Sequence, residues 1–133
     1  IKIKSTRMLL AYGFLKRLFE VFEKYETSVD VITTSEVAVS LTIENGKNLN
    51  KIVEELSIYG DVHVEKDQCI ISVVGNFIAD EKGTASKVFD SLREIPLRMI
   101  SFGGSKHNVT LLVNAKHKKE ALNALNDSLF SDK

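Results

Sequence analysis

Several residue types are scarce in this sequence, and each shortage excludes a class of protein. Its 133 residues include a single cysteine, Cys69, so no disulfide bond can form within the chain. No apolar run approaches the ~20 residues that a membrane-spanning helix needs, and no signal peptide opens the sequence. We therefore expect a cytoplasmic protein with no membrane partner, in which Cys69 is a small buried thiol.

The sequence also lacks an excess of charge of either sign. Its 18 Lys and Arg residues balance 18 Asp and Glu residues, and the balance holds along the chain. There are 9 basic and 10 acidic residues through Lys66, then 9 and 8 after it. Because surfaces that bind nucleic acid are usually net basic, we expect no nucleic-acid partner. The 44% of hydrophobic residues is typical of a folded chain.

The motifs of common active sites are missing too. The sequence contains no Gly-x-x-x-x-Gly-Lys loop and no Gly-x-Gly-x-x-Gly loop for binding phosphate groups. None of His63, His107 and His117 is spaced from a cysteine or from another histidine as zinc ligands are. Residues 103–106 have the residue types of a phosphate loop, but a hairpin turn between two strands is the favoured interpretation. We expect no catalytic site, metal or cofactor in this chain.

The sequence does contain an internal repeat, in which one structural unit occurs twice. Residues 13–22 align with residues 83–92, at an offset of 70 residues from Gly13 to Gly83. After each of these expected helices comes an apolar strand pattern, over 29–33 in the first copy and over 97–101 in the second. Such self-similarity indicates a repeated structural unit.

Hydrophobic periodicity predicts the elements of each copy. In the first copy these are a strand over 1–6, a helix from Phe14, strands over 29–33 and 37–43, a helix over 49–56 capped by Asn48, and a strand over 62–64. In the second copy these are strands over 69–74, 97–101 and 109–113, with helices over 84–94 and 121–129. The fold class is therefore α+β, with two ferredoxin-like βαββαβ units in tandem over residues 1–66 and 67–133. The second unit is one strand short, and we expect that strand to come from chain upstream of Ile1.

The segment around Gly13 has the features of a carboxylate site. A strand ends, a glycine-containing loop follows, and a helix begins at Phe14, where free N–H groups of the first turn can bind an anion. Asp30 and Glu36 flank the next strand, whose start we expect at the same end of the unit. Two acids and one anion site suit a ligand with two ammonium groups and one carboxylate, such as lysine. A plain strand-to-helix turn and solvated surface charges remain alternative interpretations.

The same residues carry a resemblance to a known family. Met8-Leu9, Gly13-Phe14-Leu15, Ser28-Val29-Asp30 and Ile32-Thr33-Thr34-Ser35-Glu36 resemble the C-terminal regulatory region of lysine-sensitive, monofunctional aspartate kinase. In the second copy the resemblance continues through Gly75-Asn76, Val88-Phe89, Arg98-Met99-Ile100 and Ser105-Lys106-His107-Asn108. It implies two ACT domains, the first inserted into the second.

The resemblance also implies a function. Aspartate kinase phosphorylates the aspartate side chain with ATP, on the route to lysine, threonine and methionine, and lysine would act as feedback inhibitor at an interface between two subunits. The kinase lobe, with ATP and magnesium, would lie upstream, and the chain would form a homodimer through its ACT domains. The implied effector site comprises Met8, Ala11, Gly13, Phe14, Leu15, Ser28, Val29, Asp30, Ser35 and Glu36. The alternative is a stand-alone amino-acid-sensing ACT module that regulates a transcription or transport partner.

Overall fold

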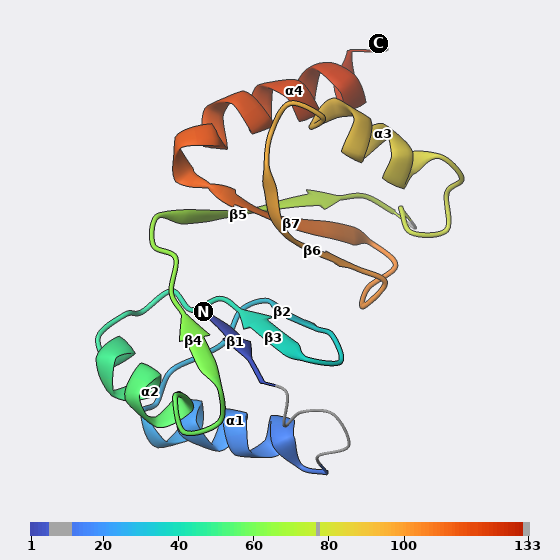
Figure 1. Ribbon diagram of the computed structural model, residues 1–133. Helices are drawn as coiled ribbons and strands as arrows, with labels where there is room; N and C mark the ends of the chain where they lie inside the picture. Colours follow the sequence, from blue (N-terminus) through green and yellow to red (C-terminus); the bar gives the residue numbers. More distant parts are fainter. Residues whose placement is uncertain (6–11, 77, 132–133) are drawn as a thin grey trace. The chain divides into compact units, whose positions relative to one another are not determined.

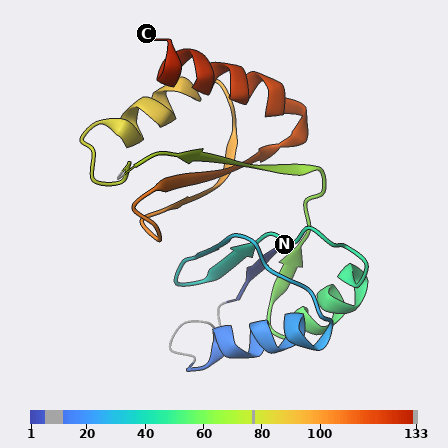
Figure 2. The same ribbon diagram turned by 180° about the vertical axis from the view of Figure 1, so that it is seen from behind.

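The computed structural model describes residues 1–5, 12–76 and 78–131, and the chain divides into two compact units, Ile1–Glu65 and Lys66–Lys133. Each unit has its own antiparallel sheet and its own pair of α-helices (Figures 1 and 2). Within the described ranges, no helix is long and apolar enough to cross a membrane.

The first unit has the element order β-α-β-β-α-β. Its elements are β1 (Lys2–Lys4), α1 (Phe14–Lys24), β2 (Ile32–Thr34), β3 (Ala38–Leu41), α2 (Leu49–Leu56) and β4 (Asp61–His63). The sheet order is β2-β3-β1-β4, and each neighbouring pair is antiparallel. Because β3 lies antiparallel between β1 and β2, these two strands run in the same direction. The predicted ferredoxin-like topology is confirmed for this unit.

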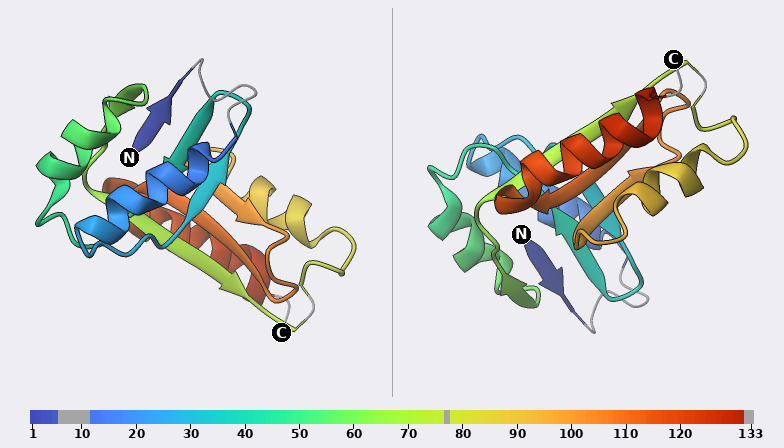
Figure 3. Two further views of the ribbon diagram at one scale, coloured as in Figure 1. Left: turned by 90° about the horizontal axis from the view of Figure 1, so that it is seen from below. Right: turned by 90° about the horizontal axis from the view of Figure 1, so that it is seen from above.

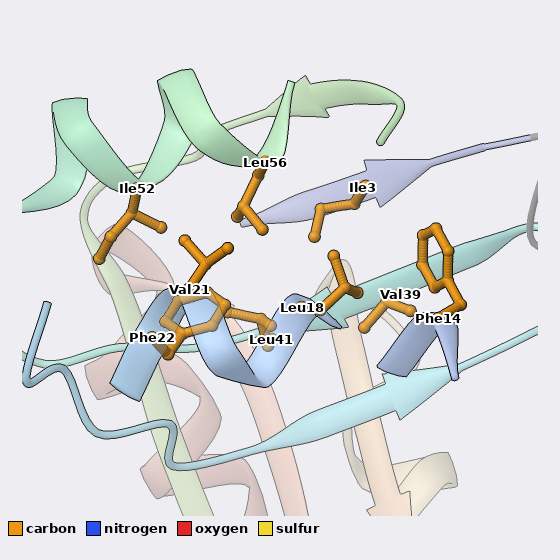
Figure 4. Packing of buried hydrophobic residues seen from close by; sticks show 9 residues of the cluster. All are labelled: Ile3, Phe14, Leu18, Val21, Phe22, Val39, Leu41, Ile52 and Leu56. Atoms are coloured by element: carbon orange, nitrogen blue, oxygen red, sulfur yellow. The ribbon is translucent and has the colours of Figure 1, made fainter. Parts of the chain in front are cut away.

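Alternation along the strands separates the two faces of this sheet. Ile3 is fully buried between the exposed Lys2 and Lys4, and on β3 Val39 and Leu41 are buried between half-buried neighbours. The helices supply the other side of the core (Figure 4). The cluster consists of Ile3, Phe14, Leu18, Val21, Phe22, Val39, Leu41, Ile52 and Leu56. Each large side chain buried here contributes about 1.5–3 kcal/mol to folding.

The second unit repeats this order with one strand fewer. Its elements are β5 (Gln68–Val74), α3 (Thr84–Ser91), β6 (Leu97–Phe102), β7 (Asn108–Asn114), a short 3-10 helix η1 (Ala115–His117) and α4 (Lys118–Phe130). The sheet order is β5-β7-β6, again antiparallel. Helices α3 and α4 lie side by side over this sheet (Figure 3). In the described part of the chain, β5 pairs only with β7, so its other edge is open.

The structure shortens several of the predicted elements. The strand expected over 29–33 begins only at Ile32, because the amides of Asp30 and Val31 bond to Thr42 outside the regular ladder. The helix expected over 84–94 ends at Ser91, shortly before Pro96, which cannot continue a helix. The strand expected over 1–6 is Lys2–Lys4, and residue 6 lies outside the described residues.

Two side-chain predictions were also wrong. Asn48 occupies the position before α2, but its side chain makes no cap bond and instead donates from Nδ2 to the carbonyl oxygen of Tyr25, at 3.0 Å. Cys69 is half-buried, not fully buried, and packs at the margin of the second core. The partner of Asn48 is distant in sequence, so the local pattern did not reveal it.

Candidate effector site

The start of α1 is organised to receive an anion. Gly13 stands at the N-cap position with φ 74°, a left-handed conformation that glycine adopts without strain. The amide of Arg17 donates to the Gly13 carbonyl at 3.1 Å, which is the first helical bond. The N–H groups of Phe14, Leu15 and Lys16 therefore have no partner within the helix, and no described side chain caps them. The positive end of the helix dipole favours a carboxylate here.

The turn between β2 and β3 lies at the same end of the unit. The amide of Ser35 donates to the Ala38 carbonyl at 2.8 Å, which closes the turn. The amide of Ser5, just after β1, donates to the Val37 carbonyl at 2.9 Å. This bond holds the turn beside the end of β1. Glu36, at the tip of the turn, is exposed.

The residues 28–30, which we call the acidic arm, lie at the other end. The amide of Asp30 donates to the Thr42 carbonyl at 3.0 Å, and the amide of Val31 donates to Thr42 Oγ1 at 3.0 Å. Thr42 follows the end of β3, and the arm follows the end of α1. Ser28 and Asp30 are exposed, whereas Val29 is half-buried and packs at the core.

The expectation that Asp30 lies beside the start of α1 is therefore wrong within one chain. Strands β1 and β2 are parallel, so the start of β2 and the end of β1 lie at opposite ends of the sheet. In Figure 1 the β2–β3 turn and the start of α1 are on one side of the unit, and the chain between α1 and β2 is on the other. The predicted site residues therefore form two groups. The group at the start of α1 and the β2–β3 turn contains Gly13, Phe14, Leu15, Ser35 and Glu36, and the acidic arm contains Ser28, Val29 and Asp30. Met8 and Ala11 lie outside the described residues.

The outer side of α1 is unexpectedly apolar. Leu15 and Phe19, both on α1, are 40% and 41% exposed. Tyr12 precedes the helix and is 97% exposed, and Val37 in the neighbouring turn is 37% exposed. Leu15 and Phe19 are four residues apart and form an apolar stripe beside the buried stripe of α1. This spacing can be recognised in the sequence.

A cluster around Tyr25 was not anticipated from the sequence. Tyr25 Oη donates to Glu55 Oε1 at 2.6 Å, and Lys24 pairs with the same carboxylate. The hydrogen bonds from Lys24 and then Tyr25 lower the pKa of Glu55, and the bond to Glu55 raises the pKa of both partners. These contacts join the end of α1 to α2, directly before the acidic arm. Nothing in the local sequence pattern pairs residues 30 positions apart.

In the second unit, the loop after β5 is bonded to the turn between β6 and β7. Gly83 precedes α3 with φ 85°, as Gly13 precedes α1. The amides of Gly75 and Ala79 donate to the carbonyls of His107 and Lys106, at 2.9 and 3.1 Å, and Ile78 is only 7% exposed. Across residues 1–5, 12–76 and 78–131, no group of three or more His, Cys, Asp or Glu side chains could hold a metal ion.

Comparison with known proteins places this architecture in a family. The family model described as ACT domain matches residues 71–129. A solved chain assigned as a C-terminal regulatory domain of aspartate kinase from Porphyromonas gingivalis W83 is 50% identical, with TM-score 0.87, over 97% of this chain and 88% of that one. The chain belongs to the regulatory domains of aspartate kinase. The resemblance drawn from the sequence motifs is confirmed.

Other aspartate kinases match over nearly the whole chain. "Aspartokinase 3, chloroplastic" of Arabidopsis thaliana is 39% identical over 98% of this chain, and "Lysine-sensitive aspartokinase 3" of Escherichia coli is 33% identical over 98%. The chain spans only 25% and 31% of these relatives' lengths. A structure of E. coli aspartokinase III in complex with lysine and aspartate matches with TM-score 0.86, 33% identity and coverage of 97% of this chain and 30% of that one.

Proposed function

We propose that this regulatory domain binds lysine and thereby controls an aspartate kinase by feedback. The kinase would transfer phosphate from ATP to the aspartate side chain, in the pathway toward lysine, threonine and methionine. Its catalytic lobe, with ATP and magnesium, would lie outside the present chain, and its compartment would be the cytoplasm. Support comes from the relatives, one of which is described as lysine-sensitive and one of which is solved with lysine.

The residues at the start of α1, in the β2–β3 turn and on the acidic arm together have the charges that would bind lysine. The free N–H groups at the start of α1 would bind the carboxylate. Asp30 would bind the α-ammonium and Glu36 the ε-ammonium. Serine hydroxyls at positions 28 and 35 would accept further hydrogen bonds, and Met8 and Ala11 would complete the site.

One observation carries the proposal that the site is shared between two copies. The start of α1 and the acidic arm lie at opposite ends of the first unit, so one chain cannot close both around one small ligand. A two-fold axis perpendicular to the strands would place one end of a protomer beside the other end of its partner. Two such sites would then form in each homodimer, each built from the helix start of one chain and the acidic arm of the other.

The apolar outer side of α1 supports such pairing. Tyr12, Leu15, Phe19 and Val37 are exposed at or near the helix start, where the second copy would cover them. Burial of apolar area contributes about 25 cal/mol per Å². Lysine would then shift an equilibrium between two arrangements of the paired domains, because it binds one of them more tightly.

Calorimetric titration of the chain with lysine tests this proposal. Binding of about one lysine per chain is expected, together with a dimer in analytical ultracentrifugation. Threonine is the control ligand, since it has a carboxylate and an α-ammonium but no second ammonium. Binding of threonine in place of lysine would show that the effector has been misassigned.

A further inference from the structure

The end of α1 is held in a conformation that non-glycine residues rarely adopt. The amides of Thr27 and Glu26 donate to the carbonyls of Phe22 and Glu23, both at 2.9 Å, which is the bond pattern of a Schellman motif. Glu26 occupies the left-handed position with φ 47°, where glycine is the usual residue. The chain direction into the acidic arm depends on this turn, which its local sequence does not favour.

Contacts from α2 stabilise this turn. Asn48 Nδ2 donates to the Tyr25 carbonyl at 3.0 Å, and Thr27 Oγ1 donates to the same oxygen at 2.9 Å. The Tyr25 hydroxyl is bonded to Glu55. Both ends of α2 therefore bond to a single residue, and that residue lies three positions before the arm.

The far end of the arm is fixed independently. Asp30 and Val31 bond through their amides to the backbone and side chain of Thr42. Residues 25–31, which include the acidic arm, are thus held by hydrogen bonds at both ends, while Ser28 and Asp30 are exposed to solvent. A segment held in its bound conformation loses less entropy when a ligand binds.

We infer that Asn48 and Glu55 are positioning residues, which act through Tyr25 to hold the acidic arm in the conformation that receives the effector. Neither residue contacts the ligand in this scheme. The inference rests on the proposed function and adds to it a link between α2 and effector binding. Because binding free energies are reciprocal, effector binding would in turn stabilise the contact of Tyr25 with α2.

The test is lysine titration of Asn48→Asp, with Asn50→Asp as the matched control. An aspartate at position 48 remains a favourable residue before a helix but has no N–H to donate to Tyr25. Asn50 lies on the same helix and is exposed, so its substitution adds the same charge without touching this contact. Loss of a hydrogen bond of this kind predicts a three- to tenfold rise, roughly, in the lysine dissociation constant for Asn48→Asp. No change is expected for Asn50→Asp.

Substitutions of Tyr25 and Glu55 test the second contact, which is the hydrogen bond between their side chains. Tyr25→Phe removes the hydroxyl and should weaken lysine binding by a similar factor. Glu55→Gln keeps an oxygen that accepts from Tyr25 and should bind lysine more tightly than Glu55→Ala. A purely structural role would lower the melting temperature of both Glu55 variants without this rescue of affinity. If Asn48→Asp fails to fold, Tyr25→Phe gives the same test.

Amide hydrogen exchange separates this inference from the proposed function. The amides of Glu26 and Thr27, which form the turn that Asn48 supports, should exchange faster in Asn48→Asp than in the unsubstituted chain, with or without lysine. If the unsubstituted chain binds no lysine, the proposed function fails. If it binds lysine and all three variants Asn48→Asp, Tyr25→Phe and Glu55→Ala bind it equally well, the positioning role is overturned. Unchanged exchange in Asn48→Asp would overturn it as well.

Discussion

Asp30 and Glu36 lie at opposite ends of strand β2. Asp30 is bonded to Thr42 beyond the end of β3, whereas Glu36 lies in the turn that begins β3. They are six residues apart, and at a strand rise of about 3.3 Å per residue this is up to about 20 Å along the chain. Two carboxylates so placed cannot hold the two ammonium groups of one lysine in a single chain. This relationship is the reason why we propose a regulatory site shared between two chains.

Neutralising either acid should weaken lysine binding. Asp30→Asn and Glu36→Gln each remove one charge-assisted hydrogen bond, which contributes about 1.5–3 kcal/mol. We expect the dissociation constant to rise by about one to two orders of magnitude in calorimetry. Both side chains are exposed, so the melting temperature should hardly change. Glu44→Gln, at an exposed position after β3, is the control and should bind lysine normally.

A close approach at Gly60 should make the first unit sensitive to a single methyl group. A Cβ atom at this position would lie 2.5 Å from the Lys4 carbonyl oxygen and 2.9 Å from Ser5 Cβ. Gly60→Ala should therefore destabilise the unit by about 1–3 kcal/mol, the usual cost of forcing extra volume into packed structure. Gly46→Ala is the control, since a Cβ there meets nothing within 4 Å. Urea denaturation compares the two, and equal stabilities would contradict the packing described here.

The Lys24–Glu55–Tyr25 cluster predicts a pH dependence of stability. The pKa of Glu55 is lowered from its ordinary value of 4.5, so its contribution is present above pH 4.5 and is lost as the pH falls through the lowered value. The pKa values of Lys24 and Tyr25 are raised, so their contributions are present below pH 10 and are lost at higher pH.

Urea denaturation of Glu55→Gln and of the unsubstituted chain at several pH values tests this pH dependence. The unsubstituted chain should be more stable than the variant at pH 7, and this difference should shrink toward pH 3. Glu54→Gln changes the charge by the same amount on the exposed side of α2 and should show no such dependence. A difference that stays constant from pH 7 to pH 3 would contradict the lowered pKa of Glu55, because ionisation of this group would then not be linked to folding.

The open edge of β5 predicts that a further strand pairs with it. Alternate amides of an edge strand face away from the sheet, and those of β5 should exchange rapidly with solvent in this chain. In a longer chain that includes the residues upstream of Ile1, the same amides should be protected. Protection of every β5 amide in the present chain would show that the edge is already covered.

The sequence predicted the topology better than the site. The repeat from Gly13 to Gly83 and the alternation along the strands were enough for the order of elements, because burial on one face imposes those patterns. The end of the sheet at which Asp30 lies follows from the predicted topology, because the two strands of a β-α-β unit are parallel and the second begins where the helix ends; the expectation for Asp30 did not apply this direction. The contacts of Asn48 and Tyr25 join distant positions, so periodicity could not reveal them.

Mixing two inactive variants tests the shared site most directly. Chains with Asp30→Asn and chains with Glu36→Gln each form homodimers in which both sites are damaged. In a mixed dimer one site combines the intact helix end of the first variant with the intact arm of the second, and the other site carries both substitutions. Random exchange makes half of the dimers mixed, so the mixture should recover about a quarter of the full-affinity lysine sites of the unsubstituted protein. Recovery of that fraction is the result expected from a site built by two chains. No recovery in a mixture whose chains demonstrably exchange would contradict it.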